Sequence, residues 1–94
     1  MTDRDRLKQA VCEAIDQRRQ RVVDLGESIM DEPELGFKEV RTAERVRQVF
    51  EEAGLEYETG LALTGVKGVL RGARPGPTVA LMGELDSLIV PDHP

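Results

Sequence analysis

The chain has 94 residues and a formal net charge of −5, so its length allows a single domain. Hydrophobic residues make up 39% of it, which argues against disorder, and no apolar run approaches the roughly 20 residues that span a bilayer. The single cysteine, Cys12, excludes an internal disulfide framework and a metal site made of cysteines alone. The first residues are too polar for a signal peptide, so we expect a soluble, cytoplasmic protein.

The first 30 residues have the pattern of an amphipathic helix that ends near Met30. Its apolar residues fall in one narrow stripe at helical spacing: Leu7, Val11, Ala14, Ile15, Val22, Leu25 and Ile29. Thr2 and Asp5 supply N-cap chemistry before this stripe. Arg18 lies within the stripe, and we expect its stem to pack while its head reaches solvent, the alternative being an ion pair or ligand contact. Cys12 is interpreted as a small packing residue.

A second helix is predicted over residues 38–53, after a break at Pro33. Gly54 follows at the position where helices often end on a left-handed glycine. Glu39 and Thr42 fall on the inward face of this helix, one turn before its apolar residues begin. A carboxylate there either caps local amides or reaches into a functional cleft, and composition favours the cap.

The second half of the chain predicts three strands, at residues 55–59, 65–72 and 78–83. The third is a short, continuous apolar run, which is typical of a strand buried on both faces. Glu84 and Asp86 follow it at positions i and i+2, where side chains of a strand share one face. Such carboxylates either belong to a functional site or cap the following turn, and the residues alone leave both readings open.

Three segments in order resemble the N-terminal part of the M20 metallopeptidase and amidohydrolase family. Residues 32–43 read EPELGFKEVRTA, similar to the family's HPELGFEE…TA segment. Thr64, Gly65 and Val66 follow, and residues 79–86 read VALMGELD, similar to the strand-plus-aspartate segment of the aminoacylase-like and hippurate-hydrolase-like branch. Glu32 departs from the family pattern, which has histidine there.

The resemblance implies an α/β fold, the N-terminal part of an α/β/α sandwich of the zinc-dependent exopeptidase type, here two helices then three strands. It implies that residues 1–94 are a truncated part of the catalytic domain, without the inserted dimerisation or lid domain. In the family a binuclear site of zinc, manganese or cobalt polarises an amide carbonyl and activates water. The expected function is hydrolysis of N-acyl amino acids or small peptides, with this segment inactive by itself.

Few site residues carry over to this chain. Asp86 matches a family aspartate that supports the metal site as a neighbour of the ligands. Glu84 stands where other branches have a histidine ligand, and we assign it no ligand role, while Glu39 and Thr42 match positions that we interpret as structural. His93, the only histidine, matches no ligand position, and the family's ligands lie beyond residue 94. We therefore expect no metal ligand, and no bound metal, in this chain.

The alternative function is a stand-alone acidic α+β module that binds proteins without catalysis. A relative that has lost its metals is a third reading. For the hydrolase, the expected partner is a small-molecule or peptide amide substrate, with neither nucleic acid nor membrane, and a homo-oligomer is allowed.

Overall fold

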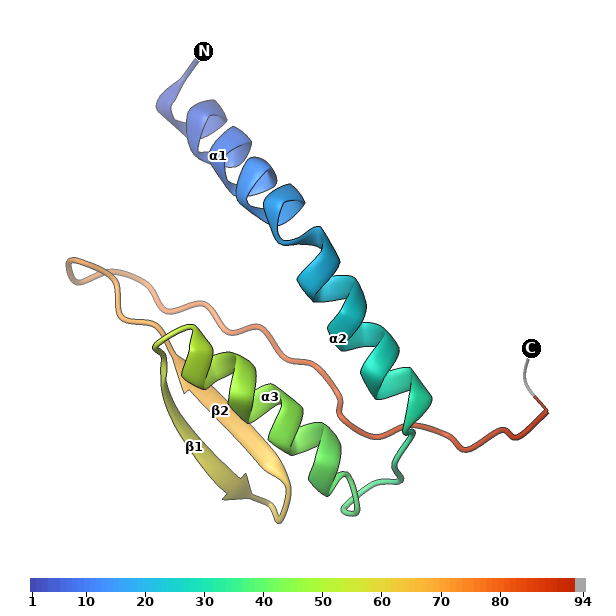
Figure 1. The fold of residues 1–94 in the computed structure, drawn as a ribbon. Coiled ribbons are helices and arrows are strands. Elements are labelled where there is room, and N and C mark those ends of the chain that lie inside the picture. Colours follow the sequence, from blue (N-terminus) through green and yellow to red (C-terminus); the bar gives the residue numbers. More distant parts are fainter. Residues whose placement is uncertain (93–94) are drawn as a thin grey trace. The chain divides into compact units, whose positions relative to one another are not determined.

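The computed structural model describes residues 1–92, which form three helices and a two-stranded sheet (Figure 1). The chain divides into two compact units, Met1–Asp31 and Glu32–Pro94. None of the helices in the described residues is long and apolar enough to cross a membrane. The predicted mixed α/β class is confirmed, although the numbers of helices and strands differ from the prediction. In chain order the elements are α1 (Asp3–Gln17), α2 (Arg19–Asp31), α3 (Val40–Glu52), β1 (Glu56–Leu61) and β2 (Gly65–Val69).

Helix α1 begins with a capping box formed by Thr2 and Asp5, as their positions predict. The backbone N–H of Asp5 donates to Thr2 Oγ1 over 3.1 Å, and the backbone N–H of Thr2 donates to Asp5 Oδ2 over 3.3 Å. The first N–H groups of a helix have no acceptor within the helix itself. The reciprocal bonds satisfy two such donors, which accounts for the start of α1 at this point.

The first predicted helix is divided at Arg18, which corrects the expectation of one continuous helix up to Met30. The Arg18 N–H donates to the Ile15 carbonyl over 3.0 Å, an i→i−3 bond that tightens the last turn of α1. The helix resumes at once, since the Val22 N–H donates to the Arg18 carbonyl over 3.0 Å. Neither α1 nor α2 buries a residue, so Cys12 is exposed and the prediction that it packs is wrong.

Helix α3 ends on the left-handed glycine that the sequence predicts. Gly54 has a φ of 71°, and its N–H donates to the Glu51 carbonyl over 3.1 Å. The Leu55 N–H donates to the Phe50 carbonyl over 3.0 Å. These two bonds form a Schellman motif, which satisfies carbonyls at the helix end. The prediction of a helix over 38–53 is confirmed within two residues at either end.

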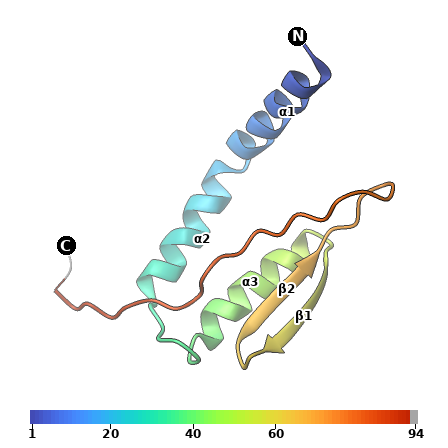
Figure 2. The same cartoon turned by 180° about the vertical axis from the view of Figure 1, so that it is seen from behind.

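Strands β1 and β2 form an antiparallel hairpin that lies along α3 (Figure 2). Both strands were predicted, although β2 ends three residues early. A Cβ on Gly65 would lie 2.6 Å from the Leu61 carbonyl oxygen, so the turn accepts no larger residue there. A Cβ on Gly68 would lie 3.0 Å from ring carbons of Phe50. The absence of a side chain at Gly68 therefore lets the Phe50 ring approach the sheet.

The third predicted strand, over 78–83, is not formed in the structure. These residues have no strand partner within the described part of the chain, and β1 pairs with β2 alone. An isolated strand leaves its backbone donors and acceptors without partners and is not stable by itself. Val79, Leu81 and Met82 are accordingly 84%, 99% and 95% exposed.

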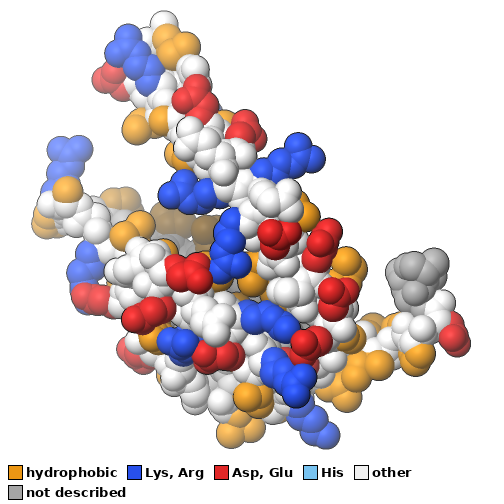
Figure 3. All heavy atoms as spheres, viewed as in Figure 1, with side chains coloured by type: hydrophobic (Ala, Val, Ile, Leu, Met, Phe, Trp, Pro, Cys, Tyr) orange, Lys and Arg blue, Asp and Glu red, His pale blue; other side chains and the backbone are white. Residues whose placement is uncertain are grey.

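The buried positions among residues 1–92 are polar rather than apolar. Glu39 is 7% exposed and Thr42 is 1% exposed, and no hydrophobic side chain in this range is buried. Figure 3 shows hydrophobic side chains, in orange, at the surface beside basic and acidic ones. Both buried positions lie at the start of α3.

Candidate functional site

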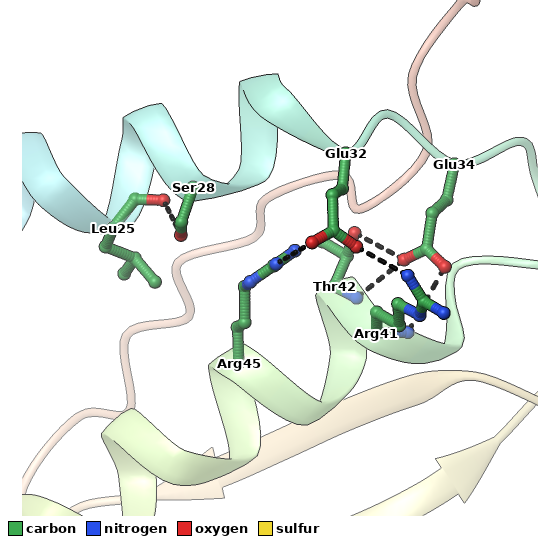
Figure 4. Close-up of polar contacts among 7 residues, drawn as sticks. All are labelled: Leu25, Ser28, Glu32, Glu34, Arg41, Thr42 and Arg45. Carbon is green, nitrogen blue, oxygen red and sulfur yellow. Dashed lines mark hydrogen bonds and ion pairs between the residues drawn. The ribbon is translucent and has the colours of Figure 1, made fainter.

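Glu34 caps the N-terminus of α3 from outside the helix (Figure 4). Its Oε1 accepts hydrogen bonds from the Thr42 backbone N–H at 2.6 Å and from Thr42 Oγ1 at 2.7 Å, and its Oε2 accepts one from the Arg41 N–H at 3.3 Å. The helix dipole also favours negative charge at this end. These bonds, the one from the Thr42 hydroxyl above all, lower the pKa of Glu34 below its ordinary value.

Glu32 forms a double ion pair with α3. Its Oε2 lies 2.8 Å from Arg41 Nη1, and its Oε1 lies 3.1 Å from Arg45 Nη2 (Figure 4). The hydrogen bond from Arg41, followed by that from Arg45, lowers the pKa of Glu32. The residue that departs from the family pattern thus connects the turn before α3 to the helix.

Glu39 occupies the N-cap position of α3, but its side chain does not cap the helix, which corrects the favoured sequence interpretation. The amides that it would have capped already donate to Glu34. Its Oε1 instead accepts a hydrogen bond from the hydroxyl of Thr64, in the turn of the hairpin. Its Oε2 is buried and has no hydrogen-bond partner among the described residues. Glu39 therefore joins the start of α3 to the hairpin.

Asp86 and Glu84 lie in an extended segment and are both exposed. Because this segment is not a strand here, the expected strand face shared by the two carboxylates is not formed. The residue after Asp86, Ser87, donates its backbone N–H to the Glu34 carbonyl oxygen over 2.7 Å. A Cβ placed on Gly36 would lie 4.0 Å from the Asp86 Cβ, which is ordinary van der Waals contact. Asp86 therefore lies beside the turn that precedes α3.

The three segments that resemble the M20 family meet around the start of α3. The first contains Glu34 and Glu39, and the second reaches Glu39 through Thr64. Ser87, the residue directly after the third segment, donates its backbone N–H to the Glu34 carbonyl. Sequence reasoning expected neither contact and gave Glu34 no role. The structure shows that Glu39 makes no capping side-chain bond, so the amides of the first turn of α3 need an acceptor from elsewhere, which Glu34 supplies. No local sequence pattern signalled this role.

The described residues hold no group of three His, Cys, Asp or Glu side chains that could bind a metal ion. The donors of residues 1–92 therefore do not fit the family's metal site, and we derive no metal-bound step from them. His93 lies outside the described residues.

A groove lies between α3 and the hairpin, and Asp86 is not among the residues that line it. The lining includes Val40, Ala43, Arg47, Gly60, Leu63 and Val66.

We expect stability to fall in acid because of Glu32 and Glu34. Their folded-state pKa values are lowered, so their stabilising contribution is fully present above the ordinary pKa of glutamate and is lost as the pH falls through the lower folded-state values. The loss of helical far-UV circular dichroism signal between pH 6 and pH 3 should be smaller in Glu34→Gln than in wild type. An identical decrease in both proteins would contradict this.

Comparison with known proteins identifies relatives that match between 60 and 74 residues of this chain. A thermostable carboxypeptidase 1 of Saccharolobus solfataricus is 37% identical over 73 residues, which are 77% of this chain and 19% of the relative. An IAA-amino acid hydrolase, ILR1-like 4, of Arabidopsis thaliana is 39% identical over 67 residues, 71% of this chain and 15% of the relative. The hippurate hydrolase of Campylobacter jejuni is 38% identical over 60 residues, 64% of this chain and 16% of the relative.

The chain spans about a fifth of the length of the curated relatives it matches. No protein-family model matches it, and no solved structure matches it. The relatives at 36–39% identity are all carboxypeptidases or amidohydrolases, as the three sequence segments predict. The chain is therefore a homologue of the M20-type metallopeptidases and amidohydrolases.

Proposed function

We propose that residues 1–94 are the N-terminal part of the catalytic domain of a metal-dependent hydrolase that cleaves the amide bond of N-acyl amino acids or small peptides. The relatives named carboxypeptidase, IAA-amino acid hydrolase and hippurate hydrolase support this reaction class. The observation that carries the proposal is the ordered match over about 70 residues. None of the named relatives favours the alternative of a stand-alone binding module.

In this proposal the metal ligands, the inserted dimerisation or lid domain and the general base belong to parts of the protein outside this chain. Bound zinc, manganese or cobalt would supply a Lewis acid and an activated water. The role of this chain is to hold Asp86 beside the metal site, where a carboxylate orients a ligand and raises its basicity. The segment alone would then be inactive. We also propose a cytoplasmic location, without nucleic-acid or membrane partners.

Substrate class can be tested on the complete protein that carries this segment. N-acyl amino acids and dipeptides with the same carboxyl-terminal residue should be compared at saturating divalent metal. We expect hydrolysis of at least one of the two series, released amino acid being the product measured. Substrates that carry an ester in place of the amide serve as a control, since they show whether the protein cleaves a more reactive acyl bond. Absence of hydrolysis in both series would contradict the proposed reaction.

A further inference from the structure

Glu34 makes hydrogen bonds through both its side chain and its backbone. The carboxylate accepts three bonds from the first turn of α3, from Arg41 and Thr42. The carbonyl oxygen of the same residue accepts the Ser87 N–H over 2.7 Å. A single residue therefore links the helix to the segment that contains Asp86.

The helix end of this link is well fixed. Thr42 is 1% exposed and donates to Glu34 through both its backbone N–H and its hydroxyl. A charged acceptor strengthens each of these bonds. The turn that follows Glu34 is closed by a bond of 3.0 Å from the Lys38 N–H to the Leu35 carbonyl. The backbone at Glu34 is therefore held by the bonds from Thr42 to its carboxylate and by the closed turn that follows it.

The Asp86 end of the link depends on that anchor. Ser87 is the next residue after Asp86, and its bond to Glu34 is the hydrogen bond that ties this part of the extended segment to the turn. Gly36 lies opposite the Asp86 Cβ at ordinary contact distance for an added Cβ. If the carboxylate of Glu34 lost its hold on α3, the carbonyl that holds Ser87 would be free to move.

We propose that Glu34 is a positioning residue for Asp86, which it holds in place by capping α3 with its carboxylate and binding Ser87 with its carbonyl. This inference rests on the proposed function, in which Asp86 supports the reaction. It extends that function to a residue for which the sequence pattern gave no role. Glu34 does not itself touch the reacting atoms in this account.

The first test is amide hydrogen exchange in the complete protein, which needs no activity. Glu34→Ala should speed exchange in the peptide covering residues 84–88 about tenfold, the equivalent of losing one helix cap. Glu34→Gln keeps an oxygen acceptor for Thr42 and should restore part of the protection. The matched control is Glu44→Ala, since Glu44 pairs with Arg47 on α3 at 2.7 Å and should leave this peptide unchanged. Unchanged exchange at residues 84–88 in Glu34→Ala would overturn the proposal.

The second test is a double-mutant cycle on amide hydrolysis. Glu34→Ala should lower kcat/KM about tenfold in wild type and less than about twofold in the Asp86→Asn background, because both changes act through Asp86. Fully additive losses would overturn the positioning role. If Asp86→Asn alone has no effect, the proposed function of Asp86 fails, whereas the exchange experiment still decides whether Glu34 holds the segment.

Discussion

Asp86→Asn in the complete enzyme is expected to lower turnover or metal affinity by about 10–100-fold, the usual cost of losing a carboxylate that orients a metal ligand. The substitution keeps the shape of the side chain and its hydrogen-bonding capacity but removes the charge. The Ser87 backbone bond to Glu34 involves no atom of the Asp86 side chain, so the local fold should remain. Hydrolysis of an N-acyl amino acid at saturating metal, together with far-UV circular dichroism, measures both outcomes.

Glu84→Gln is the matched control, because Glu84 is also an exposed carboxylate in the same segment, two residues away. It should change activity much less than Asp86→Asn does. Full activity in Asp86→Asn with loss of activity in Glu84→Gln would show that the two roles are reversed. Full activity in both variants would show that neither carboxylate contributes to the reaction.

The isolated 94-residue chain is expected to unfold without a cooperative transition. Burial of apolar surface is the main favourable term in folding, and no hydrophobic side chain is buried in residues 1–92. The run that includes Leu81 and Met82 is almost fully exposed, as is expected of a strand that lacks its neighbours. Helical signal from α1 and α3 should persist in part, since their ends carry a capping box and the Glu34 cap.

Thermal melting followed by far-UV circular dichroism tests this expectation. The isolated chain should show a broad, gradual loss of signal, and the complete protein should show a sharp transition. A sharp transition in the isolated chain would mean that it folds independently, contrary to our account.

The isolated chain should also retain well under one zinc ion per chain after dialysis. Stoichiometric zinc that is lost on His93→Ala would instead show a metal site in this chain.

Local signals in the sequence predicted the local features of the fold. The capping box at Thr2 and Asp5 and the left-handed Gly54 each depend on residues within a few positions, so their pattern was sufficient. The division at Arg18 was missed because the apolar stripe continues at helical spacing on both sides of it. The strand predicted at 78–83 depends on partner strands, and the hairpin does not supply one.

The candidate site was predicted less completely because its contacts join distant residues. Thr42 and Glu34 are eight positions apart, and Glu39 and Thr64 are 25 apart, which is beyond the reach of capping rules based on three-residue spacing. The local pattern singled out Glu84 and Asp86 together, and the match to a family segment then selected Asp86. Its placement beside the turn before α3 follows from the Ser87 bond, which no sequence pattern encodes.

The most direct test of the account is amide hydrolysis by the complete protein before and after removal of divalent metal. An N-acyl amino acid hydrolysed by the intact protein should no longer be cleaved after treatment with a chelator and dialysis, and zinc, manganese or cobalt should restore cleavage. The Asp86→Asn variant should need a higher metal concentration for half-maximal restoration. Hydrolysis that persists at full rate in the metal-free protein would contradict the assignment to a metal-dependent hydrolase.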